Sequence, residues 1–251
     1  MNITNQKDKI STLLDYERYV ARFTRALMQK GPNGINDSLQ FLLQASNSSR
    51  VYIFENFVDE ENHLSIKQSY EACAPGVTPE INNPILQHII YERDGYIRWA
   101  HELSNNNIIN GIISSFPEDE IEILESQGIK SILIIPIWVD KKWYGFIGFD
   151  DTKTEKEFSK YDIDLLRSAS EIIGLNIENI ANKNLLIKNN QKLKEANSTK
   201  DRFISILAHD LKSPFNSILG FSQLLTRNIN KYDKVKIKEY SELISLSLIH
   251  I

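Results

Sequence analysis

Two neighbouring apolar runs, residues 131–139 and 143–150, constrain the fold more than any other feature of this sequence. Each has the length of a β-strand, and Asp140-Lys141-Lys142 separates them, so together they predict a β-hairpin. Apolar residues occupy both sides of each predicted strand, so both faces of the hairpin have to be covered. We therefore expect a sheet with helices on one face and a loop region on the other.

The segments around the hairpin alternate between helical and extended patterns. Apolar residues at helical spacing predict helices over residues 10–27, 36–46, 98–103, 118–126 and 159–177. Runs of β-forming residues predict strands over residues 50–57, 64–72 and 108–114. Prolines and glycine predict a loop from Cys73 to Pro84. This order of elements indicates an α+β domain over residues 10–180.

The hairpin region resembles that of GAF domains. The residues that carry the resemblance are Glu125 to Ile137 and Trp143 to Asp151. GAF domains are sensory modules with an antiparallel sheet and helices packed on it, which is the fold that the resemblance implies here. Members bind cyclic nucleotides, bilins or haem, or mediate dimerisation, so the ligand of this GAF-like domain stays unknown.

Residue types bear on these ligands. A covalent bilin requires a placed thiol, usually with a neighbouring histidine. Cys73 is followed by Ala74 and Pro75, which favours a small buried or loop cysteine. Three histidines could by identity ligate haem, but we interpret them as surface residues: His63, His88 and His101. Three aromatic residues could line a pocket or form an ordinary core: Tyr91, Tyr96 and Trp99. No cluster has the spacing of metal ligands, so we expect no metal site.

A second distinctive segment is residues 205–220, within a predicted helix from Asp201 to Leu225. His209 lies at the flank of its apolar stripe. Asp210 can accept a hydrogen bond from one ring nitrogen of His209 and leave the other nitrogen free to react. Pro214 lacks an N–H, so the helix can bend just past the histidine. A lone helical histidine would be read as a solvated or half-buried side chain, but the surrounding run argues otherwise.

The run from Ala208 to Phe215 resembles the phosphoacceptor box of sensor histidine kinases, and the resemblance extends from Thr199 to the end of the chain. It implies that His209 is phosphorylated from ATP and that Asp210 acts as its base or orienting group. It also implies a homodimer, because the family core is a four-helix bundle made from two helical hairpins. The residues expected to contact a response regulator are Lys212, Ser213 and Phe215. Some members use Thr or Asn at the position of Ser213 to remove phosphate from their partner, so phosphatase activity stays open.

The connection between these parts, residues 181–200, predicts a helical coiled-coil linker. Its apolar seam between two protomers comprises Leu186, Leu193, Ala196, Phe203 and Leu207. A second helix is expected from Lys234 and stops at Ile251, so it would be incomplete in a phosphoacceptor domain of residues 201–251. The Asn-containing and Gly-rich ATP-binding boxes of the family are not found. We therefore expect an ATP-binding kinase domain outside this chain, in cis or in trans, and no activity of the chain alone.

Composition restricts the compartment and the partners. A net charge of -4 argues against a general nucleic-acid binder. One cysteine permits no intrachain disulfide, which favours a reducing compartment. The longest apolar run, Ile132 to Val139, is far shorter than the roughly 20 residues of a membrane span. Residues 1–9 lack the apolar core of a signal peptide. We expect a cytoplasmic protein without a membrane span.

Two hypotheses of different classes follow. The first is a sensor histidine kinase of a two-component phosphorelay, with a GAF sensor and a phosphoacceptor hairpin. The alternative is a non-catalytic dimeric ligand-binding scaffold, or a stand-alone phosphotransfer module that lacks its own kinase domain.

Overall fold

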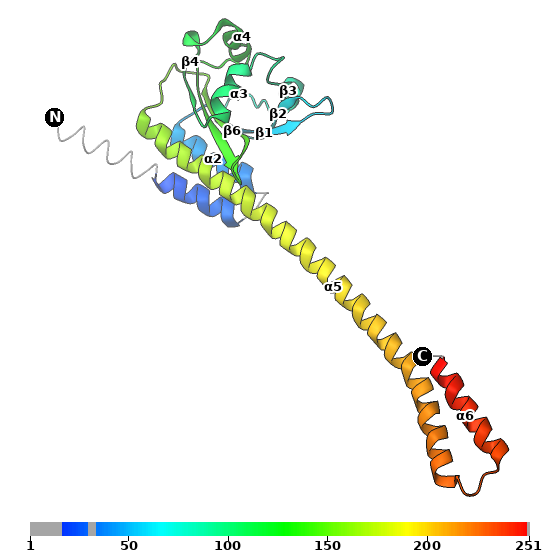
Figure 1. The fold of residues 1–251 in the computed structure, drawn as a ribbon. Coiled ribbons are helices and arrows are strands. Elements are labelled where there is room, and N and C mark those ends of the chain that lie inside the picture. Colours follow the sequence, from blue (N-terminus) through cyan, green and yellow to red (C-terminus); the bar gives the residue numbers. More distant parts are fainter. Residues whose placement is uncertain (1–16, 30–33, 250–251) are drawn as a thin grey trace. The chain divides into compact units, whose positions relative to one another are not determined.

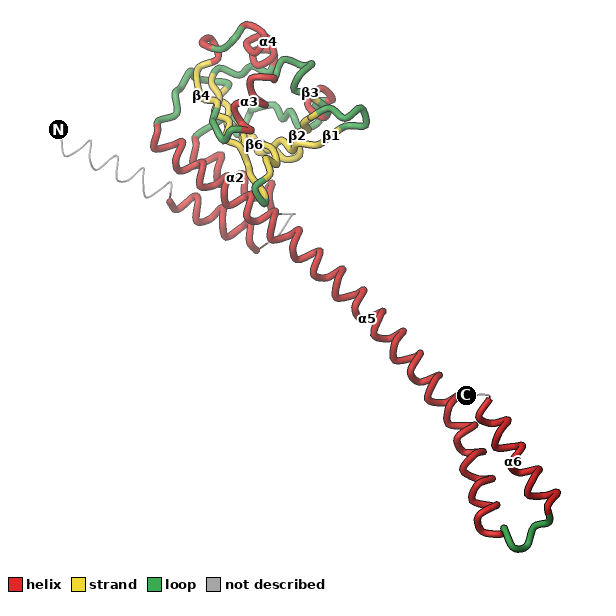
Figure 2. Tube along the Cα trace, viewed as in Figure 1, coloured by secondary structure: helices red, strands yellow, loops and turns green. Residues whose placement is uncertain are grey.

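The computed structural model describes residues 17–29 and 34–249, apart from the side chain of Tyr161. The chain divides between Lys183 and Asn184 into two units. The first is a domain of sheet and helices and the second is a helical hairpin (Figures 1 and 2). Helix α5, Lys160–Asn228, contributes residues to both units. No helix in the described ranges combines the length and the apolar character needed to cross a membrane.

The first unit contains a six-stranded antiparallel sheet with the strand order β3-β2-β1-β6-β5-β4. The strands are Arg50–Val58 (β1), Leu64–Cys73 (β2), Ile89–Ile90 (β3), Ile109–Ile112 (β4), Ser131–Val139 (β5) and Lys142–Asp151 (β6). The predicted hairpin is confirmed as β5 and β6. Its turn residues, Asp140 and Lys141, have φ values of 47° and 60°. Positive φ at both positions is typical of the two-residue turn whose twist matches that of the strands.

Helices cover one face of this sheet (Figure 1). They are the helix of residues 17–29, α2 (Ile35–Ser46) and the beginning of α5. The core between these helices and the sheet includes Phe23, Leu39 and Leu166 from the helices and Val51 and Phe149 from the strands. Gly174 allows α5 to lie directly on β5, because a Cβ at this position would stand 2.2 Å from the carbonyl oxygen of Trp138. A side chain at residue 174 would therefore separate this helix from the sheet.

Short helices and loops cover the other face (Figure 2). They are η2 (Pro84–Gln87), α3 (Ile97–Ser104), η3 (Ile113–Ser115) and α4 (Glu118–Ser126). The core between these elements and the sheet includes Tyr52, Phe54, Trp99 and Phe146. Alternate residues of β5 enter the two cores: Ile132 and Ile134 on this face, Leu133 and Ile135 under the helices. The burial that the apolar hairpin required is thus found on both faces.

The boundaries differ from the sequence prediction in a few places. The strand predicted over residues 108–114 is shorter, because Ile113–Ser115 turns into a 3-10 helix. Strand β3 was not predicted, since a strand of two residues is too short for its pattern to be visible. Helix α2 begins at Ile35 and not at residue 36. The predicted first helix is confirmed over residues 17–27, and its part over residues 10–16 lies outside the described residues.

The second unit is an antiparallel hairpin of the C-terminal part of α5 and α6, Lys234–Ile249 (Figure 1). Helix α5 continues through Pro214 and ends at Asn228, close to the break that the sequence predicted. Aromatic rings join the two helices: Phe221 stacks on Tyr240 with ring centroids 5.6 Å apart. The hairpin is therefore formed within one chain, while much of its apolar surface stays exposed.

Candidate functional site

His209 is presented to solvent on α5. Its side chain is 86% exposed, and that of Asp210 is 69% exposed. The Nδ1 atom of His209 lies 3.2 Å from Oδ1 of Asp210. This contact favours the tautomer that carries its hydrogen on Nδ1, which leaves the lone pair of Nε2 free. No hydrogen-bond partner for Nε2 is found in residues 17–29 and 34–249. The site therefore presents an accessible nitrogen nucleophile with a carboxylate that orients it.

The other predicted residues of this site lie on the same stretch of helix. Lys212 and Ser213 are exposed, and Phe215 is 55% exposed. Residues three and four positions apart share a helix face, so Lys212 and Ser213 lie on the face of His209. Phe215, six positions after His209, lies about 120° around the helix from it. The structure thus places a nucleophile, a cation and a hydroxyl on one accessible face, with an exposed aromatic ring on a neighbouring face. Such a surface can react and dock a second protein at the same time.

A histidine beside a carboxylate is not distinctive by itself. On α3, Nδ1 of His101 lies 3.3 Å from Oε1 of Glu102, and the His101 side chain is 75% exposed. The geometry closely matches that of His209 and Asp210. The difference lies in the residues that follow His209, from Leu211 to Phe215. His101 is therefore a matched reference for any chemistry assigned to His209.

The first unit contains a partly open cavity of about 30 Å³ between the sheet and the α3–α4 face. Its apolar wall includes Phe54, Ile66, Leu86, Trp99, Leu124 and Phe146. Its polar wall consists of Arg50, Gln68, Glu71, Glu80, Gln127 and Asp150. An apolar pocket with a few convergent polar groups is the usual form of a small-molecule site.

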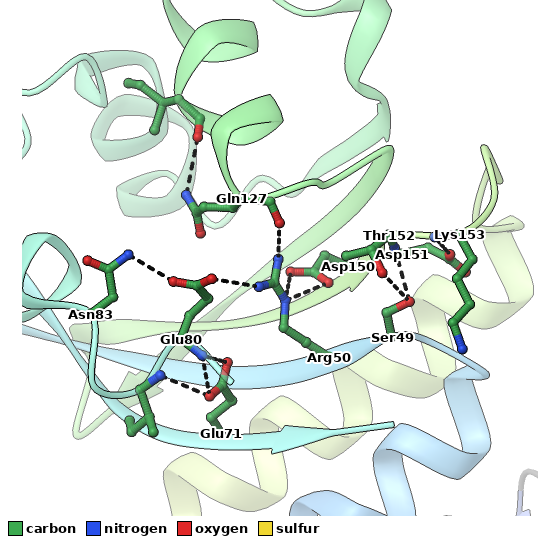
Figure 3. A network of polar contacts seen from close by, with 12 residues as sticks. Ser49, Arg50, Glu71, Glu80, Asn83, Gln127, Asp150, Asp151, Thr152 and Lys153 are labelled. Atoms are coloured by element: carbon green, nitrogen blue, oxygen red, sulfur yellow. Dashed lines mark hydrogen bonds and ion pairs between the residues drawn. The ribbon is translucent and has the colours of Figure 1, made fainter. Parts of the chain in front are cut away.

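A buried ion pair joins β1 and β6 in the polar wall (Figure 3). Arg50 and Asp150 are 2% and 0% exposed and face each other in the strand register. Nε of Arg50 donates to both carboxylate oxygens of Asp150, at 3.0 and 3.1 Å, and Nη2 donates to the carbonyl oxygen of Gln127 at 3.2 Å. Burial raises the pKa of Asp150 to about 6, because the attraction of Arg50 offsets the loss of water only in part.

Residues 74–83, which we call the strap, connect β2 to η2 beside this pair. Figure 3 shows how Glu71 and Glu80 hold it. The carboxylate of Glu71 accepts the backbone N–H groups of Glu80 and Ile81, both at 2.9 Å. The Glu80 carboxylate accepts from Asn83 at 2.8 Å and lies 3.7 Å from Nη1 of Arg50. Glu80 also lines a second hollow of about 380 Å³ outside the cavity, as do Arg50 and Gln127, so these three residues border both spaces.

The aromatic residues singled out in the sequence were expected either to line a pocket or to form an ordinary core, and both roles are found. Tyr91, Tyr96 and Trp99 all belong to the buried core, and Tyr96 and Trp99 also line the cavity. The indole nitrogen of Trp99 donates to Glu120 at 2.9 Å. Arg98 in turn binds the Glu120 carboxylate at 2.6 and 2.7 Å. This network fixes the ring of Trp99 in the cavity wall.

The candidate haem and bilin ligands do not line the cavity. The side chains of His63, His88 and His101 are 41%, 51% and 75% exposed, which confirms them as surface residues. Cys73 is at the end of β2, and burial raises the pKa of its thiol to about 11. None of these four residues lines the cavity. Among the residues that the structure describes, no group of three or more acidic, histidine or cysteine side chains could hold a metal ion.

Comparisons with known proteins cover both units. Residues 35–177 match the family model of the GAF domain, and residues 199–249 match that of the His Kinase A (phospho-acceptor) domain, HisKA. The methanogenesis regulatory histidine kinase FilI of Methanothrix harundinacea is 37% identical over 212 residues, which are 81% of this chain and 24% of that protein. The hybrid signal transduction histidine kinase G of Dictyostelium discoideum is 24% identical over 67% of this chain and 5% of its own length. The chain thus spans about a quarter of the first relative and less of the second.

Solved structures resemble the first unit in fold. The phycoerythrobilin-bound GAF domain from a cyanobacterial phytochrome has a TM-score of 0.56 at 14% identity, covering 68% of this chain and 98% of that chain. The phycocyanobilin-bound GAF domain from a cyanobacterial phytochrome has a TM-score of 0.55 at 14% identity, covering 65% and 94%. The expected antiparallel sheet with packed helices is therefore confirmed as a GAF fold.

Proposed function

Because the chain belongs to the GAF-domain family and carries a HisKA phospho-acceptor domain after it, as sensor histidine kinases do, we propose that it works in a two-component phosphorelay. The GAF domain would receive the signal and His209 would receive phosphate from ATP. The observation that carries this proposal is the exposed Nε2 of His209 beside Asp210, within the HisKA match. In this proposal the GAF sensor domain is residues 10–180, the helical coiled-coil linker is residues 181–200, and the phosphoacceptor domain is residues 201–251. The cytoplasmic location stays a prediction.

In the proposed reaction, Nε2 of His209 attacks the γ-phosphorus of ATP while the bond to the ADP oxygen breaks. Asp210 holds the hydrogen on Nδ1 and stabilises the positive charge that develops on the ring. An ATP-binding domain, in cis or in trans, would supply the nucleotide. An aspartate of a response regulator would then attack the phosphorus and release neutral His209. Lys212, Ser213 and Phe215 would contact that regulator, which their exposure permits.

Asparagine in place of Asp210 should slow phosphorylation of His209 by about 10- to 100-fold. Asparagine can still accept the hydrogen bond from Nδ1, but it carries no charge to stabilise the ring. The measurement is the initial rate of acid-labile phosphate formation with ATP and a separately added histidine-kinase ATP-binding domain. Asp201→Asn, an exposed change on the same helix, is the control and should keep the normal rate. An unchanged rate in Asp210→Asn would exclude Asp210 as the base or orienting group of His209.

A second copy of the chain would cover the apolar stripe of α5. The side chains of Leu186, Leu193, Phe203 and Leu207 are 63%, 61%, 61% and 44% exposed. Residues at this spacing form the seam of a coiled coil, and burying them stabilises two helices that are marginal alone. This exposure supports the proposed homodimer. Because α5 also packs on the GAF sheet, a shift of this helix would carry the signal toward His209.

We expect no covalent bilin on this chain, although its solved neighbours bind bilins. Cys73 lies outside the cavity, and a thiol with a pKa of about 11 is almost entirely protonated at neutral pH. The chain would be incubated with phycocyanobilin and examined by zinc-induced fluorescence on a denaturing gel, beside a bilin-binding GAF domain. A fluorescent band that Cys73→Ser abolishes would contradict this expectation.

A further inference from the structure

Arg50 has unused hydrogen-bonding capacity in the cavity wall. Its Nε and Nη2 atoms are hydrogen-bonded, but Nη1 has only the ion pair with Glu80 at 3.7 Å. This distance is too long for a hydrogen bond. Within the described part of the chain Nη1 has no hydrogen-bond acceptor, although the Arg50 side chain is only 3% exposed. Nη1 is not one of the fully buried polar atoms without a partner in the described residues, so it reaches open space and is available to an acceptor from outside the chain.

A second polar group in the same cavity is also unsatisfied. Gln68 is 3% exposed and lines the cavity, and its Oε1 atom is buried without a hydrogen-bond partner. A water or a ligand in the cavity would be the natural partner of this amide. Arg50 and Gln68 belong to the neighbouring strands β1 and β2. In the register of these strands Gln68 lies opposite Phe54, four residues along β1 from Arg50, so the two groups lie at different places along the cavity wall. Both point to an occupant of the cavity with polar atoms.

Glu80 differs from Asp150 as a partner of Arg50. The Asp150 side chain is 1% exposed and hydrogen-bonded, whereas that of Glu80 is 22% exposed and too distant for a hydrogen bond. A partly exposed ion pair without a hydrogen bond contributes little. Glu80 presents a carboxylate on a short aliphatic stem near the unsatisfied Nη1. It can therefore be regarded as an internal substitute for a ligand of the same chemistry.

We propose that a short aliphatic carboxylate replaces Glu80 on Nη1 of Arg50 and places its apolar part in the cavity. This inference rests on the proposed sensory role of the GAF domain. Asp150 already neutralises Arg50, so an additional anion would be accepted only when Glu80 leaves. The exchange keeps the number of charges near Arg50 unchanged. The favourable free energy of binding comes from a hydrogen bond to Nη1 of Arg50, which Glu80 does not make, and from apolar contact of the ligand with the cavity wall.

The surroundings of Glu80 suit such an exchange. The hollow that it borders is also lined by Lys153, Thr78, Ser126 and Thr152. Lys153 is exposed and would attract an incoming anion. Glu80 lines both the cavity and the hollow, together with Arg50 and Gln127, so its movement would widen the connection between the two spaces. The strap would then be released from Arg50, so ligand binding could change the conformation of the domain.

The test is calorimetric titration of the whole chain with sodium propionate and sodium butyrate at constant ionic strength. Propionamide and propylammonium, of similar size but without the negative charge, are the comparison probes. We expect saturable binding of the two carboxylates and none of the comparison probes. Glu80→Gln should tighten carboxylate binding about fivefold, because the internal competitor is lost while a similar side chain remains. Glu92→Gln, which removes an exposed carboxylate from the same domain, should change nothing.

The sign of the Glu80→Gln effect is decisive. Weaker or unchanged carboxylate binding in this variant, binding of propylammonium alone, or no saturable binding of either carboxylate would each overturn the inference. Phosphorylation of His209 is measured on the same preparation with an added ATP-binding domain. Normal phosphorylation without carboxylate binding would remove this inference and leave the proposed function. Carboxylate binding without phosphorylation would remove the proposed function and leave the binding site.

Discussion

Replacing His209 by glutamine is expected to abolish the acid-labile phosphate that this chain gains from ATP in the presence of a histidine-kinase ATP-binding domain. Glutamine is of similar length and polarity, but it has no nitrogen lone pair able to attack phosphorus. The His209 side chain is 86% exposed, so its replacement should leave the fold intact. The loss should exceed 100-fold, on the order of the largest effects of removing one reacting group. Labelled phosphate, measured before and after acid treatment, is the readout.

The control is His101→Gln. His101 has almost the same distance to its neighbouring carboxylate, 3.3 Å against 3.2 Å, and a similar exposure, but it lies on α3 of the GAF domain. This variant should be phosphorylated as rapidly as the original chain. Together the two variants separate a histidine in the right sequence from one that only has the right local geometry. Phosphate that persists in His209→Gln, or is lost in His101→Gln, would show that the acceptor has been assigned wrongly.

The second large effect is expected in the GAF core. Replacing Arg50 by methionine should lower the free energy of unfolding by about 3–5 kcal/mol at pH 8, because Asp150 would keep a buried charge without its partner. Urea denaturation followed by tryptophan fluorescence measures this change. The double variant Arg50→Met, Asp150→Leu should recover most of the loss. Arg93→Met, which breaks an exposed pair with Asp94, should cost at most about 1 kcal/mol.

The pH dependence of this destabilisation has a definite sign. In the folded chain the pKa of Asp150 is about 6, above its ordinary value of 3.8. The folded state therefore keeps a proton that the unfolded state releases in this range, so this group makes the free energy of unfolding fall as the pH rises from 3.8 to about 6. Without Arg50 the pKa rises further. The destabilisation of Arg50→Met should then be largest above neutral pH and shrink on acidification. A constant difference from pH 5 to pH 8 would contradict this account.

The sequence predicted best the features that depend on neighbouring residues. The hairpin of β5 and β6 was visible because an uninterrupted apolar pattern surrounds a short polar turn. The long helical run through Pro214 and the second helix from Lys234 were visible from their spacing. The contact between His209 and Asp210 was predicted as well, since adjacent residues of a helix need no tertiary contact to meet. The roles of these two residues in phosphoryl transfer stay predictions.

The polar wall of the cavity was not predicted, although a signal was present. Arg50 opens one strand and Asp150 lies near the end of another, and both strands are otherwise largely apolar. Opposite charges at the ends of buried strands indicate a pair only when the strands are neighbours in the right register. That register, Arg50 opposite Asp150, follows from the sheet order and not from either strand alone. The sequence around Glu80 gave no sign that this residue lies near Arg50, because its position depends on the path of an irregular loop.

The sequence by itself therefore determined the class of fold, the hairpin, the helical segments and the contact between His209 and Asp210, because local periodicity and adjacent side chains specify them. Only the tertiary structure decided that Arg50 meets Asp150 across 100 residues of chain and that Glu80 lines both the cavity and the neighbouring hollow. These contacts arise when distant strands pair and bury charge together. Their energy depends on burial and register, which no single segment contains.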